Sequence, residues 1–559
     1  MRPNLVPPVW LLLWFAVALF AIFQHGPLPL YSTRTLGVAW EMWNQHGFLV
    51  PHINGHAYSH KVPLLFWLIH GGWAVSGVND VWPRVLQVLI GAAWLLAAVA
   101  LARRVYALRP AVARLAPWFL IALAYSFLFG LQIMYEVLLA LWVALALVAL
   151  AGRPRWGWFA LAIGAGLMTK GPVMLLHVAF PLLLGPWWSE YARADRAGWY
   201  RRGLLAVLGG LAILLAWVIP AAIVGGEEYR HELLFMQTAG RVVDSFDHAR
   251  PLLWYLPMLG VLLFPWIGWL RLWHAGFSFR RPLGDGERFL IAWLVPTFAV
   301  FCLISGKQVY YLLPLLPGAG MALACLIARQ QAAGSGKGWG WGAWPLALAA
   351  LAFAVVLFLL PVWQASGRMH SHWLHDAAAL SPWFAVGFVA LSLLLLLPGE
   401  GEKELHRIAG ASLLGVALAH SLFAQALFHN YDLTPTADLL QRLQADGRPI
   451  ANVGAYEGQF HYHARLSGSI AEIRNDDIGA WAKAHPDGVV VRYPAKLDPR
   501  ARRFALLIQP FRSRWLEVWD ATTVAAIEAG QTPAEPAQRT ALYPPDYWRY
   551  GEPVERAGD

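Results

Sequence analysis

Charged residues and cysteines are scarce in this sequence. Only 14% of the 559 residues are charged and 58% are hydrophobic, whereas an average soluble chain is roughly 25% charged. This composition excludes a soluble globular protein. Both cysteines, Cys302 and Cys325, lie in apolar runs, so neither a disulfide framework nor a cysteine-based zinc site is expected.

Motifs for nucleotide and nucleic-acid binding are also missing. The Gly-rich stretch 332–340 lacks the Gly-Lys-Ser/Thr ending of a phosphate loop. The net charge of +10 is spread over many loops, which is typical of contact with anionic lipid and not of a nucleic-acid surface. We therefore expect membrane lipids as partners, and no nucleic acid.

Long apolar runs are abundant instead. A helix needs roughly 20 apolar residues to cross a hydrocarbon core of about 30 Å, and such stretches recur between Val9 and Phe428. We predict an α-helical polytopic membrane protein with about thirteen transmembrane helices, anchored in the interfaces by many of its 31 tryptophans.

The distribution of basic residues predicts the topology. The first apolar run, 9–23, follows a short basic start and has no convincing cleavage site, so we expect an uncleaved anchor with its N-terminus inside. Arginine and lysine then cluster in every second loop, which the positive-inside rule places in the cytoplasm. The long segments 24–81 and 225–251 are then expected outside, together with the chain after Phe428.

The chain after Phe428 is polar and has a different pattern. Strand-like runs at 450–455, 488–493 and 504–508 are separated by helix-like runs at 436–445 and 477–485. We predict a small periplasmic α/β domain at 429–559, following a transmembrane domain at 1–428 that includes the two outside segments.

Cations with few matching carboxylates gather in the outside segments, where a phosphate-bearing lipid headgroup could bind them. The alternative for Arg34 and Lys61 is that each is a surface cation reaching toward the headgroups from a helix end. Lys61 precedes a proline and an apolar run, which holds it where the chain enters the interface. The candidate phosphate-binding cations are Arg34 and Lys61 in the first outside segment, Arg241 in the second, and Lys170 and Lys307 in short turns expected on the same side.

Glu136 lies in the apolar stretch 131–150, where an ionised carboxylate is costly unless it faces a polar cavity. It is a functional candidate, and the alternative is a paired structural acid. Four outside histidines, His52, His56, His60 and His248, could form a metal site because imidazole is the commonest zinc ligand, and His60 and His248 are the candidate ligands. The alternative is that these loop histidines are solvated hydrogen-bonding groups. The sequence leaves open whether a divalent metal, Zn or Mg, is bound or no cofactor is used.

Four short motifs of the first outside segment and three later ones resemble the aminoarabinose-transferase (ArnT-like) and protein-mannosyltransferase group of integral-membrane GT-C glycosyltransferases. The matching residues are Tyr31-Ser32-Thr33-Arg34, Trp40-Glu41-Met42, Asn54-Gly55, His60-Lys61-Val62-Pro63-Leu64-Leu65, Thr169-Lys170-Gly171-Pro172, Asp247-His248-Ala249-Arg250-Pro251 and Ser305-Gly306-Lys307 with Tyr310-Tyr311.

The resemblance implies transfer of a sugar from a polyprenyl-phosphate donor, such as undecaprenyl phosphate, at the periplasmic face of the bacterial inner membrane. The acceptor would be lipid A, another glycan or a protein, and the reaction a single inverting displacement. Arg34, Lys61 and Tyr311 would hold the lipid phosphate, and Glu136 matches an acidic position near the acceptor. Other groups expected to stabilise the departing phosphate are Lys170, Arg241, Lys307 and Tyr310.

Two positions depart from the family pattern. Tyr31-Ser32 replaces an acidic pair whose first member is credited with activating the acceptor, and His60 replaces a glutamate that in some members binds metal. Tyr31 therefore stands at the catalytic position, and the remaining candidate bases are Glu136, Glu41 and a neutral His60. An acceptor that is itself a phosphate would need no base.

Two other classes of protein compete with the enzyme interpretation. A catalytically silent relative that binds polyprenyl-phosphate lipid or a partner subunit is suggested by the absent acidic pair. A transporter is disfavoured because the sequence shows no internal repeat and its polar residues collect at the outer interface.

Overall fold

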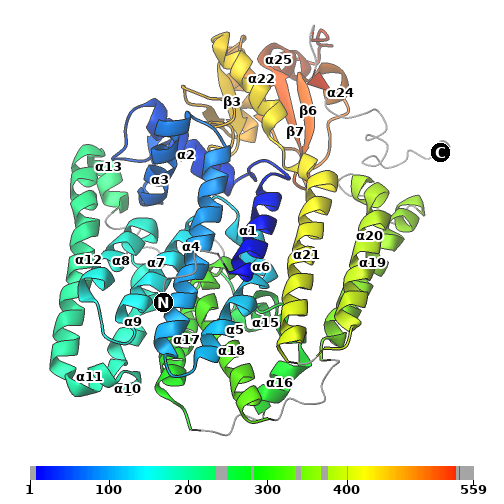
Figure 1. Ribbon diagram of the computed structural model, residues 1–559. Coiled ribbons are helices and arrows are strands. Elements are labelled where there is room, and N and C mark those ends of the chain that lie inside the picture. The colour runs from blue at the N-terminus through cyan, green and yellow to red at the C-terminus, as the bar shows by residue number, and fades with distance from the viewer. Residues whose placement is uncertain are drawn as a thin grey trace.

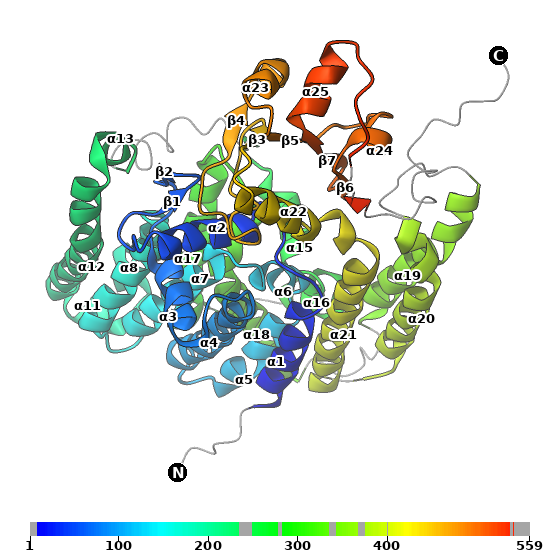
Figure 2. The ribbon, with the colours of Figure 1, turned by 90° about the horizontal axis from the view of Figure 1, so that it is seen from above.

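The protein is described here from a computed structural model that covers residues 8–233, 249–277, 282–334, 342–366, 375–399, 401–536 and 540–541. A helical bundle forms most of the molecule, and a smaller domain with a β-sheet stands at one end of it (Figure 1). Seen from above, α12 lies at one edge of the bundle and α19 with α20 at the opposite edge (Figure 2).

Seven helices among the described residues are long and apolar enough to cross a membrane, which confirms the prediction of a polytopic membrane protein. They are α4 (Val81–Val105), α12 (Arg196–Val224), α17 (Asp285–Leu303), η3 (Val309–Leu315) continued by α18 (Leu316–Ala332), α19 (Trp344–Ala365), α20 (His375–Leu396) and α21 (Glu402–Ala426).

A bent pair and several shorter helices complete the bundle. The pair α5 (Pro110–Ile121) and α6 (Ala124–Gly130) makes an eighth span if its two halves, bent by 61°, are counted together. The shorter apolar helices are α1 (Val9–Ile22), α3 (Leu64–Ser76), α7 (Tyr135–Leu150) and α9 (Val173–Leu183), beside α8 (Trp156–Lys170). The remaining short helices are α10 (Gly185–Trp188), α11 (Glu190–Ala194), α13 (Gly226–His231), α15 (Tyr255–Leu262), η2 (Trp266–Gly268) and α16 (Leu270–Phe277).

Burial separates central helices from lipid-facing ones. The apolar window of α4 is 67% buried and that of α12 only 22%. Leu204 and Leu205 of α12 are largely exposed. A helix that is apolar all round and still exposes leucines is typical of one that faces lipid.

The segment 24–81 has defined secondary structure and is not a plain loop. It contains α2 (Ser32–Asn44) and a hairpin of β1 (His52–Ile53) and β2 (His56–Ala57), and it leads into α3. The turn between the strands is Asn54-Gly55, and both residues have positive φ (56° and 79°). Asn-Gly is the preferred pair for a two-residue hairpin turn of this conformation.

The small domain is built on a six-stranded mixed sheet of order β4-β3-β5-β7-β6-β8. β3 pairs in parallel with β4 and β5, and β7 pairs antiparallel with β5 and β6. The strands are β3 (Ile450–Val453), β4 (Ala471–Ile473), β5 (Val489–Arg492), β6 (Leu507–Phe511), β7 (Arg514–Asp520) and β8 (Thr540–Ala541). The helices are η5 (Phe428–Asn430), α22 (Thr434–Ala445), η6 (Asn475–Asp477), α23 (Ile478–Ala484), α24 (Ala501–Phe504) and α25 (Ala521–Glu528).

The predicted α/β character of this region is confirmed, and two of the three predicted strands coincide with β3 and β5. The third, 504–508, was placed too early, because Phe504 ends α24 and the strand begins at Leu507. β7 was missed because the charged Arg514 and Glu517 interrupt its apolar pattern. Glu517 is fully buried and its charge is matched by Arg492, whose Nε lies 2.6 Å from Glu517 Oε2.

Candidate active site

The candidate site lies where the ends of α7 and α8 meet η3, at the end of the bundle near the small domain. Glu136 stands in the first turn of α7 and Lys170 is the last residue of α8. A carboxylate at a helix N-terminus and a cation at a helix C-terminus are each favoured by the helix dipole. Their side chains form an ion pair, Lys170 Nζ to Glu136 Oε1, at 2.7 Å, and both are largely buried.

This ion pair changes two expectations from the sequence. Lys170 has a matching carboxylate, contrary to the prediction of unmatched cations, because the partner comes from a neighbouring helix. Glu136 is paired, as expected if it were a structural acid, but only one of its two oxygens takes part in the pair. Its Oε2 is buried and makes no hydrogen bond within the described residues, so it can accept one from a substrate group.

Two tyrosines of η3 cover Lys170. Lys170 Nζ lies 4.3 Å from the ring centre of Tyr311 and 5.9 Å from that of Tyr310, both within the range of cation–π attraction. Tyr310 in turn packs edge-to-face on Tyr31 of the first outside segment, with 6.4 Å between ring centres. The structure thus brings together four predicted site residues from three distant parts of the chain.

Lys61 contacts the residue that precedes Glu136. Its Nζ is 5.6 Å from the ring centre of Tyr135, the residue before Glu136. Pro63 ends the segment that carries Lys61 and serves as the N-cap of α3, which anchors this lysine at the start of an apolar helix. Lys61 and Lys170 therefore each contact one of the first two residues of α7.

Lys307 is buried in the turn between α17 and η3. Its ammonium donates a hydrogen bond to the backbone oxygen of Arg250 at 3.1 Å, next to a β-bridge between Ala249 and Gly306. Tyr255 closes the turn by donating its hydroxyl hydrogen to Gln308 O at 3.0 Å. The turn that follows the predicted Ser-Gly-Lys motif is therefore fixed by contacts with the chain around residue 250.

Arg34 of α2 is ion-paired with Glu457 of the small domain. Arg34 therefore has a matching carboxylate, contrary to the expectation for the outside cations, because the partner lies in a separate part of the chain. The pair connects the first outside segment to the loop after β3.

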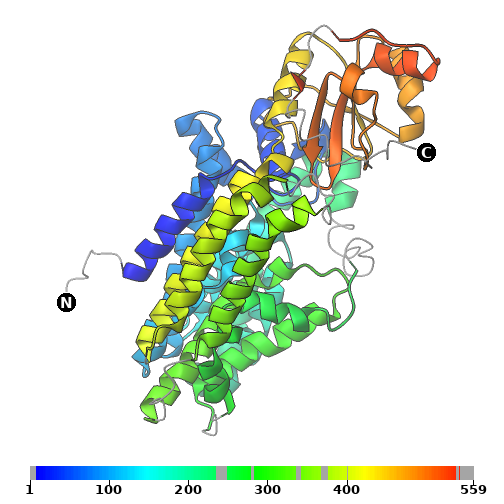
Figure 3. The same cartoon turned by 90° about the vertical axis from the view of Figure 1, so that its right-hand side faces the viewer.

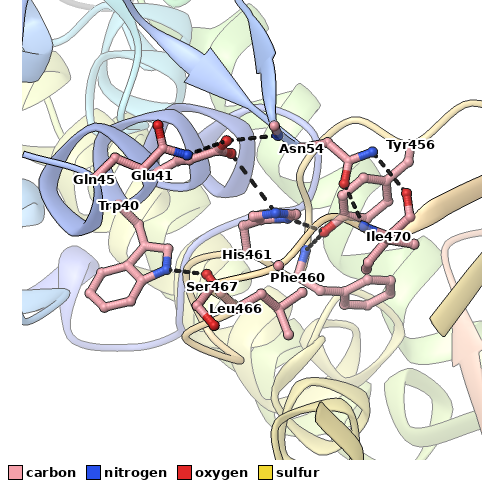
Figure 4. A network of polar contacts seen from close by, with 12 residues as sticks. Trp40, Glu41, Gln45, Asn54, Tyr456, Phe460, His461, Leu466, Ser467 and Ile470 are labelled. Atoms are coloured by element: carbon pink, nitrogen blue, oxygen red, sulfur yellow. Dashed lines mark hydrogen bonds and ion pairs between the residues drawn. The ribbon is translucent and has the colours of Figure 1, made fainter. Parts of the chain in front are cut away.

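Glu41, a predicted candidate base, lies in the contact between α2 and the small domain (Figure 4). Its Oε1 accepts hydrogen bonds from Gly55 N at 2.7 Å and Gln45 Nε2 at 3.1 Å, and its Oε2 faces His461 Nε2 at 3.9 Å. Burial raises the pKa of Glu41 above its ordinary value. These contacts indicate that Glu41 holds the hairpin turn and the small domain together.

The same contact contains residues that sequence reasoning did not select. Asn54 donates to Ile470 O at 2.9 Å and accepts from Ile470 N at 2.7 Å, and Trp40 Nε1 donates to Leu466 O at 2.8 Å. Figure 4 shows these groups side by side. The Asn54-Gly55 pair could have indicated a hairpin, but no local signal identifies the partner segment.

The metal prediction is not supported by a ligand set in the described part of the chain, where no three His, Cys, Asp or Glu residues are placed to hold one ion. His60 contacts the ring of Tyr58, with 5.2 Å between centres. His248 and Arg241 lie outside the described residues, so their predicted roles stay predictions.

Sequence similarity connects the chain to known proteins. No family model matches the chain. Over 427 residues it is 27% identical to an undecaprenyl phosphate-alpha-4-amino-4-deoxy-L-arabinose arabinosyl transferase of Edwardsiella ictaluri, covering 72% of this chain and 75% of that protein. A protein of the same name from Pseudomonas paraeruginosa is 32% identical over 357 residues, which are 58% of this chain and 61% of the relative.

The fold also matches a solved structure. A crystal structure of ArnT from Cupriavidus metallidurans bound to undecaprenyl phosphate aligns with a TM-score of 0.68 at 18% identity, covering 91% of this chain and 96% of that one. Its apo structure aligns equally well.

In sequence the chain is similar to arabinosyl transferases, and in fold it is similar to ArnT. These similarities confirm the resemblance to ArnT-like membrane glycosyltransferases inferred from its motifs.

Proposed function

We propose that the protein transfers a sugar from an undecaprenyl-phosphate donor to a phosphate group of a membrane lipid such as lipid A. The names of its relatives specify the donor class, and the similar ArnT structure contains undecaprenyl phosphate. In this proposal residues 1–428 form the membrane domain with its outside segments 24–81 and 225–251, and residues 429–559 form the second domain.

The single observation that carries the proposal is the ion pair of Glu136 and Lys170 beneath Tyr311. It gives the site a buried cation held in place by a carboxylate, and Lys61 contacts the neighbouring Tyr135. We infer that Arg34, Lys307 and Tyr310 also contribute to donor binding. Cations fixed around a departing phosphate stabilise the charge that develops on it.

The reaction is a single inverting displacement. An acceptor oxygen attacks the anomeric carbon, the bond from that carbon to the donor phosphate oxygen breaks, and undecaprenyl phosphate leaves with the electron pair. The protein must align the two substrates and stabilise the leaving phosphate.

The proton balance favours an acceptor that is already anionic. Tyr31 and Ser32 replace the acidic pair, Glu41 lies in the domain contact, and one oxygen of Glu136 is occupied by Lys170. A phosphate oxygen is deprotonated near neutral pH, so it can attack without a general base. A hydroxyl acceptor on a glycan or protein would need one.

Orientation is part of the proposal. The small domain, α2 and α3 lie at one end of the bundle, and the C-terminal end of α4 with Arg103 and Arg104 lies near the other (Figure 1). Because basic residues favour the cytoplasmic side, the site and the small domain would face the periplasm of the inner membrane.

The test is a transfer assay in nanodiscs with labelled polyprenyl-phosphate sugars and either lipid A or dephosphorylated lipid A. We expect label to reach only the phosphorylated acceptor, and Lys61→Ala to reduce transfer about tenfold or more, since a charge-assisted phosphate contact is worth roughly 1.5–3 kcal/mol. Arg153→Ala, at an exposed site away from the small domain, is the control. Transfer to the dephosphorylated lipid would contradict the acceptor, and saturable donor binding without any transfer would favour the silent relative.

A further inference from the structure

The parallel part of the small domain's sheet has a switch point between β3 and β5. The chain runs from β3 to β4 on one side and later returns to β5 on the other side, giving the order β4-β3-β5. In open α/β sheets, ligands bind in the crevice at the carboxyl ends of the strands at such a point. None of the predicted site residues lies there.

An open pocket of about 810 Å³ occupies this position. It is lined by the ends of β3 and β5 and by the turn that joins β6 to β7. Three of its ten lining residues are arginines, Arg492, Arg512 and Arg514, and none is acidic.

Two of these arginines give the pocket a positive charge that no carboxylate of the described chain compensates. Arg492 is matched by Glu517 at 2.6 Å and by Asp498 at 3.0 Å. Arg512 and Arg514 are exposed and pair with no carboxylate of the described chain. Arg514 donates to Tyr493 O at 3.2 Å, which directs its guanidinium toward the end of β5.

The turn holds Arg512 in an unfavourable backbone conformation. Its φ is +57°, which costs a non-glycine residue roughly 1–2 kcal/mol. Glycine would avoid this cost, but it would not present a guanidinium at the tip of the hairpin.

The pocket lies close to the end of the membrane-spanning helix α21. The backbone N–H of Arg512 donates to Asn430 O at 2.6 Å, and Gln509 Nε2 donates to Asp432 O at 2.8 Å. Both acceptors follow closely after Ala426, where the membrane-spanning α21 ends. Figure 3 shows the strands of the small domain running down to the end of this helix.

The pocket is also connected to the candidate active site. The loop after β3 leaves the pocket at Gly454 and reaches Glu457, the partner of Arg34. Three residues span at most about 11 Å. A lipid headgroup held in the pocket would therefore lie near Arg34 of α2.

We propose that this pocket binds a phosphate group on the headgroup of the acceptor lipid. The inference rests on the proposed function, which supplies a phosphorylated acceptor. Guanidinium groups match phosphate geometry in bidentate hydrogen bonds, and two uncompensated arginines at headgroup depth favour this ligand over a neutral sugar.

The test measures binding, not transfer. The full chain in phosphatidylcholine nanodiscs is titrated with fluorescent lipid A, and wild type is compared with the double variant Arg512→Gln/Arg514→Gln. Arg442→Gln, at an exposed arginine of α22 outside the pocket, is the matched control. We expect the double variant to weaken lipid A binding about tenfold or more, with undecaprenyl-phosphate binding and the thermal unfolding midpoint unchanged, and the control to match wild type.

Three outcomes overturn the inference: equal affinity of wild type and double variant, equal affinity for phosphorylated and dephosphorylated lipid A, or equally effective competition by phosphatidylglycerol, which would assign the pocket to bulk anionic lipid. Failure of the proposed function looks different. In that case lipid A binding depends on Arg512 and Arg514 while no sugar transfer occurs with any donor.

Discussion

Glu41 of α2 and His461 of the small domain face each other across the contact between these two parts of the chain, with 3.9 Å between Oε2 and Nε2. The Tyr456 hydroxyl accepts the N–H of Phe460 at 3.1 Å and lies 2.7 Å from His461 Nδ1. The two ring nitrogens of His461 thus face Tyr456 and Glu41, Nδ1 through a hydrogen bond with the tyrosine hydroxyl and Nε2 at the longer distance from the carboxylate.

This arrangement predicts that acid weakens the contact. Burial lowers the pKa of His461 to about 4, against 6.5 for an unperturbed histidine. Because the pKa of His461 is lower in the folded protein than in the unfolded chain, the free energy of unfolding keeps its full value above about pH 6.5. It decreases as the pH falls toward 4. Between pH 7.5 and 5 the loss is about 2 kcal/mol. The raised pKa of Glu41 acts in the opposite direction, losing stability as pH rises, so a comparison of variants is needed.

The measurement is thermal unfolding of wild type and His461→Gln at pH 7.5 and 5. Glutamine can accept from Tyr456 and donate to Glu41 without titrating, so we expect the variant to lose less stability in acid. His485→Gln, at a half-buried histidine of the same domain, should behave as wild type. Identical acid sensitivity of wild type and His461→Gln would remove His461 as the cause.

Gly37 allows the small domain to approach α2. A Cβ added at Gly37 would lie 2.6 Å from the backbone oxygen of Gly458. Alanine normally stabilises a helix interior by up to about 1 kcal/mol relative to glycine, but here we expect Gly37→Ala to destabilise the contact by about 1–3 kcal/mol. Gly71→Ala in α3, where the added Cβ meets nothing within 4 Å, is the control and should be neutral or stabilising. Faster hydrogen exchange at residues 456–470 in Gly37→Ala alone is the expected readout.

Asn54 holds Ile470 through two hydrogen bonds to the backbone, and both are buried. Asn54→Gly keeps the positive φ of the turn but removes both bonds, so Ile470 N–H and C=O lose their partners. We expect a loss of about 2–4 kcal/mol, because each buried polar group left without a partner costs roughly 1–3 kcal/mol. Chemical denaturation of detergent-purified protein measures this loss, and a change below about 0.5 kcal/mol would mean that water replaces both bonds.

The membrane helices could be predicted because length and apolar composition are local properties. Helices such as α4 (Val81–Val105) lie within the region 9–428 where apolar runs recur. Glu136 and Lys170 stand out in the sequence as charged residues beside apolar runs, although their ion pair cannot be read from it.

Pairings between distant segments could not be predicted in the same way. Glu457, the partner of Arg34, and His461, which faces Glu41, lie in one short segment. This segment has no unusual composition. β7 was hidden because the charge of Glu517 is neutralised by Arg492 on the neighbouring strand, and strand prediction from hydrophobic alternation assumes that charged residues face water. Such contacts depend on tertiary structure, which a single sequence does not specify residue by residue.

Glu136 is expected to affect turnover more than donor binding. Glu136→Gln leaves every predicted phosphate-binding cation in place, so donor affinity should change less than about twofold. Lys170 would lose the carboxylate that fixes its ammonium, and stabilisation of the leaving phosphate would fall. A loss of about 1.4 kcal/mol of transition-state stabilisation lowers kcat about tenfold, and we expect at least this decrease.

Steady-state kinetics and undecaprenyl-phosphate binding on the same preparation separate the two effects. Glu190→Gln, at an exposed acid of α11, is the control. Unchanged kcat would remove Glu136 from the catalytic machinery, and a parallel fall of kcat and donor affinity would mean that Glu136 organises the donor phosphate site itself.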